Sequence, residues 1–145
     1  MTDMKRMNLI KPSINTPFHI DFDWWKEMDQ NWRVDLRGLL CAEHQEEMKA
    51  FPEDQLIDWV DPETAEVKPM DGLQHLVSSH CALQDDFLTD HTTLVDAVFR
   101  TLMSNGNKPT SPQEFGNYLG RSPETILKTL AGPRVYKGIR PFINN

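Results

Sequence analysis

Two closely spaced helix starts in the last third of the chain restrict its fold more than any other feature of the sequence. Ser111 is followed three residues later by Glu114, which is the capping-box pattern of a helix N-terminus. Gly120 then provides the residue that most easily takes a positive φ and ends a helix. Ser122 and Pro123 start the next helix. We expect two short helices joined by a tight turn, over residues 112–119 and 123–131.

A third helix is expected just before this pair. Thr93 is a suitable N-cap, and Leu94, Val98 and Leu102 recur at the spacing of one helical face. A short basic segment, residues 134–142, follows the three helices and has the composition of a β-strand. Three helices followed by a basic β-prone segment is the order of elements in a winged helix.

Residues 112–130 resemble the helix-turn-helix family of bacterial repressors, including the lactose-repressor type. That family has a small residue where the two helices cross, which matches Gly116, and a glycine in the turn, which matches Gly120. Phe115 and Leu119 match the apolar residues that flank the turn. The Ser-Pro-Glu-Thr-Ile run that begins at Ser122 is similar to the Ser-x-x-Thr-Val opening of the family's second helix. The likeness is strict over about 20 residues and loose over about 50.

The resemblance implies that the second helix lies in the DNA major groove, with its N-terminal residues near the base edges. The sequence departs from the family at Arg121 and Thr129, where apolar residues are common, and at Leu127, where a polar residue is expected. A winged helix can also act as a protein-interaction module, because fold does not fix function. The expected nucleic-acid contacts are Arg121, Ser122, Thr125, Lys128, Arg134, Lys137 and Arg140.

The charge of the chain is divided unevenly between two parts. The 145 residues carry a formal net charge of −7, but residues 92–145 hold seven Lys or Arg against three Asp or Glu. Residues 1–91 are correspondingly acidic. The sequence therefore predicts an acidic α+β module over residues 1–91 and a winged-helix-like module over residues 92–145. Because the connection between them is short, we expect the two modules to pack together.

The acidic part is expected to contain short strands and two helices. Alternating apolar residues predict strands over residues 18–24 and 32–37. A hairpin is expected over residues 56–68, turning at Asp61-Pro62-Glu63-Thr64. The four tryptophans of the acidic part are expected mainly in the core, with one or two exposed to a protein partner. Helices are expected over residues 39–50 and 72–80.

Both cysteines of the chain have a histidine nearby. Cys41 and His44 form a Cys-x-x-His knuckle, and His80 and Cys81 are adjacent. Two thiolates and two imidazoles are the ligands of a closed, structural, tetrahedral zinc site. Adjacent side chains on a helix diverge by about 100°, so His80 and Cys81 can share an ion only at a helix end or an irregular turn. His75 is an alternative to His80.

Other readings of the polar residues remain open. His19, Asp21 and Asp23 would share one strand face and could bind a divalent metal, although a solvated strand face has the same pattern. A small metal-dependent hydrolase would use an open coordination position near Glu43 or Glu47. The phosphate-binding, dinucleotide-binding and hydrolase motifs are absent, so we expect no enzyme and no small-molecule substrate.

The sequence as a whole favours a cytoplasmic, zinc-containing protein that binds DNA or takes part in transcription. No apolar run of about 18 residues and no apolar signal segment is visible, so no membrane contact is expected. Two cysteines are too few for a disulfide framework. The alternative from another class is an adaptor that uses the winged helix and an acidic or tryptophan-bearing surface to bind a protein.

Overall fold

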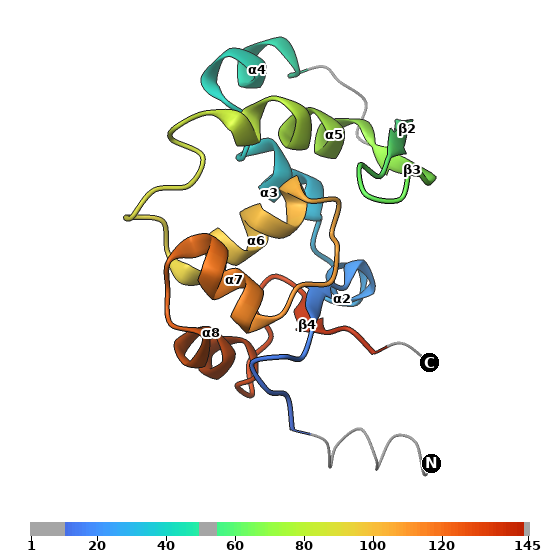
Figure 1. Cartoon of the computed structure of the whole chain (residues 1–145). Helices are drawn as coiled ribbons and strands as arrows, with labels where there is room; N and C mark the ends of the chain where they lie inside the picture. Colours follow the sequence, from blue (N-terminus) through green and yellow to red (C-terminus); the bar gives the residue numbers. More distant parts are fainter. Residues whose placement is uncertain (1–10, 50–54, 144–145) are drawn as a thin grey trace.

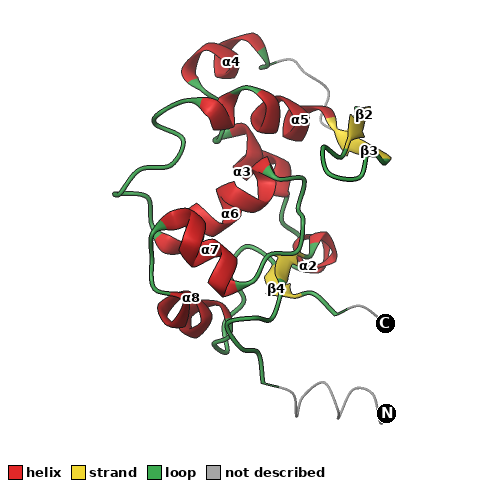
Figure 2. Ribbon diagram, in the orientation of Figure 1, coloured by secondary structure: helices red, strands yellow, loops and turns green. Residues whose placement is uncertain are grey.

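The computed structural model describes residues 11–49 and 55–143, and the fold is α+β (Figure 1). Helices form most of the regular structure, and two small antiparallel sheets complete it (Figure 2). Most of the polar lead-in expected over residues 1–15 and the end of the helix expected over 39–50 lie outside the described residues. Within the described ranges, no helix is both long and apolar enough to cross a membrane.

The elements follow one another in short segments. The first half of the chain contains β1 (Phe18–Ile20), α2 (Phe22–Glu27), α3 (Trp32–Arg37), α4 (Ala42–Glu47), β2 (Leu56–Val60), β3 (Val67–Asp71), α5 (Gly72–Ser79) and the 3-10 helix η1 (Cys81–Leu83). The second half contains α6 (Leu94–Ser104), α7 (Pro112–Leu119), α8 (Pro123–Leu130) and β4 (Ile139–Pro141).

The three helices expected in the second half are present; α7 has the predicted ends, and α8 ends at Leu130, one residue before the predicted end. Ser111 and Glu114 form the capping box of α7, each side chain bonding the other residue's backbone N–H. Gly120 ends α7 in the left-handed conformation, at φ 67°. A Cβ atom on Gly116 would lie 2.7 Å from the backbone oxygen of Arg121, so only glycine lets α7 approach the turn this closely.

Two of the strand predictions were wrong in whole or in part. The strand expected over residues 18–24 ends at Ile20, because the Asp21 side chain accepts from the N–H of Asp23 and starts α2. The strand expected over residues 32–37 is the helix α3, which the Asn31 side chain caps. In a six-residue segment, apolar residues four apart fit an alternating pattern and a helical face equally well.

The two sheets join different parts of the chain. In one, β2 and β3 form the predicted antiparallel hairpin, in which Leu56 faces Asp71 and Val60 faces Val67. In the other, β1 pairs antiparallel with β4 from the far end of the fold. Phe18 also bridges to Thr110, in the connection between α6 and α7. The basic segment thus forms a short strand, as expected, and its partner is the strand β1.

One cluster of buried side chains contains residues from both sides of position 91. Phe18 and Ile20 of β1 are at most 1% exposed, as are Phe99 of α6 and Phe115 of α7. Leu73 and Val77 of α5, and Ile126 and Leu130 of α8, belong to the same cluster. Of the tryptophans, Trp25 is buried and donates to the backbone oxygen of Lys137, and the other three are half-buried.

Candidate metal centre

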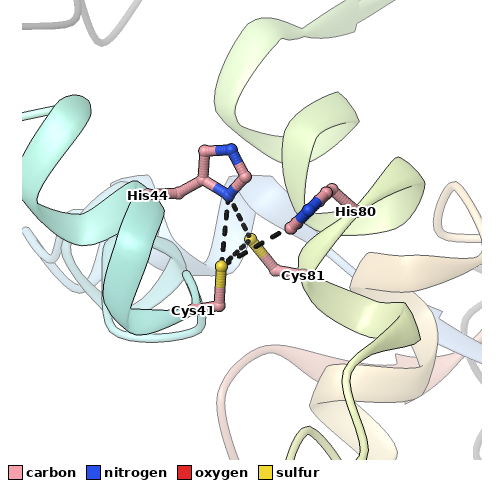
Figure 3. A group of neighbouring side chains, drawn as sticks. All are labelled: Cys41, His44, His80 and Cys81. Atoms are coloured by element: carbon pink, nitrogen blue, oxygen red, sulfur yellow. Dashed lines mark hydrogen bonds between the residues drawn. The ribbon is translucent and has the colours of Figure 1, made fainter.

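The two cysteines and two of the histidines converge at one end of the molecule, between α4 and the junction of α5 with η1 (Figures 1 and 3). Cys41 is the N-cap of α4, and His44 lies in the first turn of the same helix, so one helical start presents both side chains inward. His80 separates α5 from η1, and Cys81 begins η1. The site therefore joins two segments nearly 40 residues apart in the chain.

An irregular backbone at His80 solves the problem of two adjacent ligands. His80 has φ −132° and ψ −60°, outside helical values, and it ends α5 and precedes η1. The change of direction lets His80 and Cys81 face the same point, as the sequence analysis required. His75, the alternative ligand, is not a member of the cluster.

The ligand atoms lie at the separations of a metal site. Cys41 Sγ is 3.1 Å from His44 Nδ1 and 3.8 Å from His80 Nδ1. Cys81 Sγ is 3.6 Å from Cys41 Sγ and also 3.6 Å from His44 Nδ1. All four atoms lie within 4.8 Å of one another. The proximity predicted for these four residues is confirmed.

A tetrahedral zinc ion requires almost the same distances. Bond lengths of about 2.3 Å to sulfur and about 2.05 Å to nitrogen separate two thiolates by about 3.8 Å, and a thiolate from an imidazole by about 3.6 Å. The four separations given above differ from these values by at most half an ångström, and the other two pairs of ligand atoms lie within 4.8 Å. Small side-chain rotations are thus sufficient for four-coordinate binding, and two sulfur and two nitrogen donors fit zinc.

The surroundings of the two thiols differ. A hydrogen bond from the backbone N–H of His44 lowers the pKa of the Cys41 thiol, which favours the thiolate that binds a metal. Burial raises the pKa of the Cys81 thiol, which is 1% exposed. Both imidazoles use Nδ1 toward the cluster, and His44 Nε2 lies 4.0 Å from the Glu47 carboxylate. A carboxylate on the outer nitrogen is a common means of orienting a metal-binding imidazole.

The other metal hypothesis has a different outcome. His19, Asp21 and Asp23 do not form a metal-binding group among the described residues. Asp21 caps α2 and pairs with Arg140 at 3.2 Å, and His19 packs edge-on against Phe142.

Comparison of the chain with family models, with curated proteins and with solved structures gave no match.

The residues expected to approach nucleic acid lie on and after α8. Ser122 caps the helix by accepting from the N–H of Thr125, and Ser122, Thr125 and Lys128 are exposed. Ile126 and Leu130 point into the core. The outer face of α8 is consequently polar and open to solvent.

The basic residues expected at the interface have unequal freedom. Lys137 lies 3.2 Å from Asp35 and 3.6 Å from Asp96, and it ties together three segments of the fold. Arg121 donates to the backbone oxygen of Thr92. Sequence reasoning missed the carboxylate partners of Lys137, because the closer one precedes it by 102 residues and no local pattern links them.

Arg134 and Lys128 differ from these anchored cations. Both are exposed, and neither pairs with a carboxylate among the described residues. The Arg134 guanidinium lies 5.2 Å from the centre of the Tyr136 ring. Arg140 is intermediate, since it pairs with Asp21 while 39% of its side chain remains exposed. A nucleic-acid surface here would rely mainly on Lys128 and Arg134.

Proposed function

We propose that the chain is a zinc-containing helix-turn-helix protein that binds duplex DNA through α8, and that it acts in transcription or a related process on DNA. The α7–α8 pair carries the proposal, because its tight glycine crossing leaves a polar helix face open beside two exposed cations. A helix placed in this way can enter the major groove while flanking cations contact phosphates.

Zinc, in this proposal, is a structural ion held by Cys41, His44, His80 and Cys81. Four protein ligands leave no position for substrate, so the ion supplies folding free energy rather than catalysis. It joins α4 to α5, and α5 packs on α6 within the common core. Thiols kept reduced for metal binding fit a reducing compartment such as the cytoplasm.

Salt-dependent DNA binding tests the α8 surface. Labelled duplex DNA of mixed sequence is titrated with zinc-loaded protein and followed by fluorescence anisotropy between about 50 and about 200 mM salt. We expect binding that weakens steeply with salt. The double variant Lys128→Glu with Arg134→Glu should lose binding while keeping its melting temperature, because neither cation holds another element in place.

A matched charge change elsewhere provides the control. Lys26→Glu with Lys49→Glu alters the net charge equally, but on α2 and beyond α4. This control variant should bind DNA nearly as well as the original chain. No binding by the original chain at low salt, or equal loss in both double variants, contradicts a specific role for the α8 face.

A second candidate function, a protein-binding adaptor, is favoured by the outer face of the β2–β3 hairpin. Leu56, Val60 and Val67 are between 55% and 61% exposed on that face. Exposed apolar patches of this kind mark protein contacts in many folds. If DNA binding is absent, replacing Val60 and Val67 by serine is the next variant, with the loss of a co-purifying partner as its readout.

A further inference from the structure

A cavity of about 450 Å³ lies at the start of α5, where the β2–β3 hairpin meets α3 and the loop after α6. Its lining includes Trp32, Trp59, Gln74 and Asn107. The volume falls within the range of small-molecule sites, roughly 300–1,000 Å³. The metal cluster and the outer face of α8 are not part of this lining.

Aromatic side chains from two separate elements form walls of the cavity. Trp59 comes from β2, and it is held against the loop after α6, where a Cβ on Gly106 would lie 3.2 Å from its ring. Trp32 comes from α3 and contacts the ring of Phe22, with ring centres 4.7 Å apart. Both tryptophans are half-buried, so part of each ring remains available to a ligand. Aromatic walls of this kind favour ligands that contain flat rings.

One side-chain amide in the wall makes no hydrogen bond to another described residue. Gln74, in the first turn of α5, is 6% exposed and lines the cavity. No described residue donates to its side-chain oxygen or accepts from its side-chain nitrogen, whereas the neighbouring Asp71 carboxylate is fully engaged. No enclosed side-chain nitrogen or oxygen of the described residues lacks a partner, so the amide atoms of Gln74 are accessible at the cavity wall rather than sealed in the core. The Gln74 amide therefore offers an adjacent donor and acceptor to a ligand in the cavity.

The charges in the lining are already balanced. Arg33 is held by the Asp71 carboxylate at 2.8 Å and lies over the Trp32 ring. Lys108 pairs with Glu63, and Lys68 lies 3.7 Å from Glu66. With each cation facing a carboxylate, the cavity does not select for an anionic ligand such as a phosphate.

We propose that this cavity binds a purine nucleoside, with the base between the tryptophan-bearing walls and its amino edge on the Gln74 amide. A glutamine amide pairs with adenine through the N6 amino group and N7, a donor and an acceptor side by side. The uncharged sugar would face the opening. This site is independent of the proposed DNA contact, since the two share no residue.

Nucleoside titrations followed by calorimetry and by amide NMR test the site. Adenosine should bind saturably to the full chain and shift the side-chain amide signal of Gln74, assigned by its loss in Gln74→Leu. Purine riboside lacks the amino group, so it should bind about tenfold or more weakly. Gln74→Leu should lower the affinity for adenosine at least to that of purine riboside. It should weaken purine riboside less, because that nucleoside loses only the hydrogen bond to N7.

Two further variants separate the site from general effects. Trp59→Leu should weaken both nucleosides together, because it removes stacking and no hydrogen bond. Gln30→Leu, at an exposed glutamine between α2 and α3, should change neither. The proposal is overturned if adenosine does not saturate at millimolar concentration. It is equally overturned if the original chain binds both nucleosides equally, a comparison that needs no variant to fold.

Discussion

Zinc dependence of the melting temperature gives the sharpest test of the metal centre. Bound ligand stabilises the folded state by RT ln(1 + [L]/Kd), which is about 1.4 kcal/mol for each tenfold rise in free zinc above Kd. Unfolding 145 residues carries an entropy of about 0.3 kcal/mol per kelvin. The melting temperature should therefore rise by about 4–5 °C per tenfold, and by about 13 °C at a thousandfold excess over Kd.

The assay is thermal unfolding in metal-ion buffers under reducing conditions. Cys81→Ser should lose the dependence on free zinc, because it removes a buried ligand of the cluster. His75→Asn is the matched control: it removes an imidazole of α5 that lies outside the cluster, and the slope should persist. Cobalt substitution should give the absorption of a tetrahedral ion with thiolate ligands.

Three results would refute the reasoning. The first is a melting temperature independent of free zinc. The second is loss of the zinc dependence in His75→Asn to the same extent as in Cys81→Ser. The third is a cobalt spectrum of six-coordinate type, which would mean that the sulfur and nitrogen atoms do not close around one ion.

Three other variants probe separate parts of the fold. Gly116→Ala should destabilise by about 1–3 kcal/mol in urea unfolding, because its Cβ would lie 2.7 Å from the Arg121 oxygen, whereas Gly132→Ala, which meets nothing closer than 3.5 Å, should be nearly neutral. Ser111→Ala should cost about 0.5–2 kcal/mol through loss of the α7 capping box, and an unchanged urea midpoint would contradict that role. Burial lowers the pKa of His19 below 6.5, so the unfolded state binds its proton more readily, and this contribution to stability is complete above pH 6.5 and is lost as the pH falls. The difference in unfolding free energy between the original chain and His19→Gln should accordingly change between about pH 7 and about pH 5, and a constant difference would contradict it.

Local chemistry explains which features could be predicted from the sequence. The ends of α7 and α8 follow from residues within four positions of each other, such as Ser111 with Glu114, so no distant contact was needed. The Cys41–His44 knuckle is equally local. His80 and Cys81 could be assigned to the same metal cluster only on the condition that the backbone at His80 is irregular. The structure meets that condition.

The features that were missed depend on contacts between distant segments. The residues from Trp32 to Arg37 alternate as a strand would, but the Asn31 cap and the burial of Leu36 against the core select a helix. The carboxylate partners of Lys137 come from α3 and α6, and no spacing in the sequence relates them. The place of the Gln74 amide in the cavity wall is likewise visible only once the hairpin and α3 surround it.

The pairing of β1 with β4 sets an order of events during synthesis. Phe18 and Ile20 leave the ribosome early, but the strand that covers them is made more than a hundred residues later. Asp21 likewise waits for Arg140, 119 positions further on. Until then, two of the most deeply buried side chains of the fold lack their partner strand. A chain that ends after α8 should therefore be cleaved by proteases faster than the full chain.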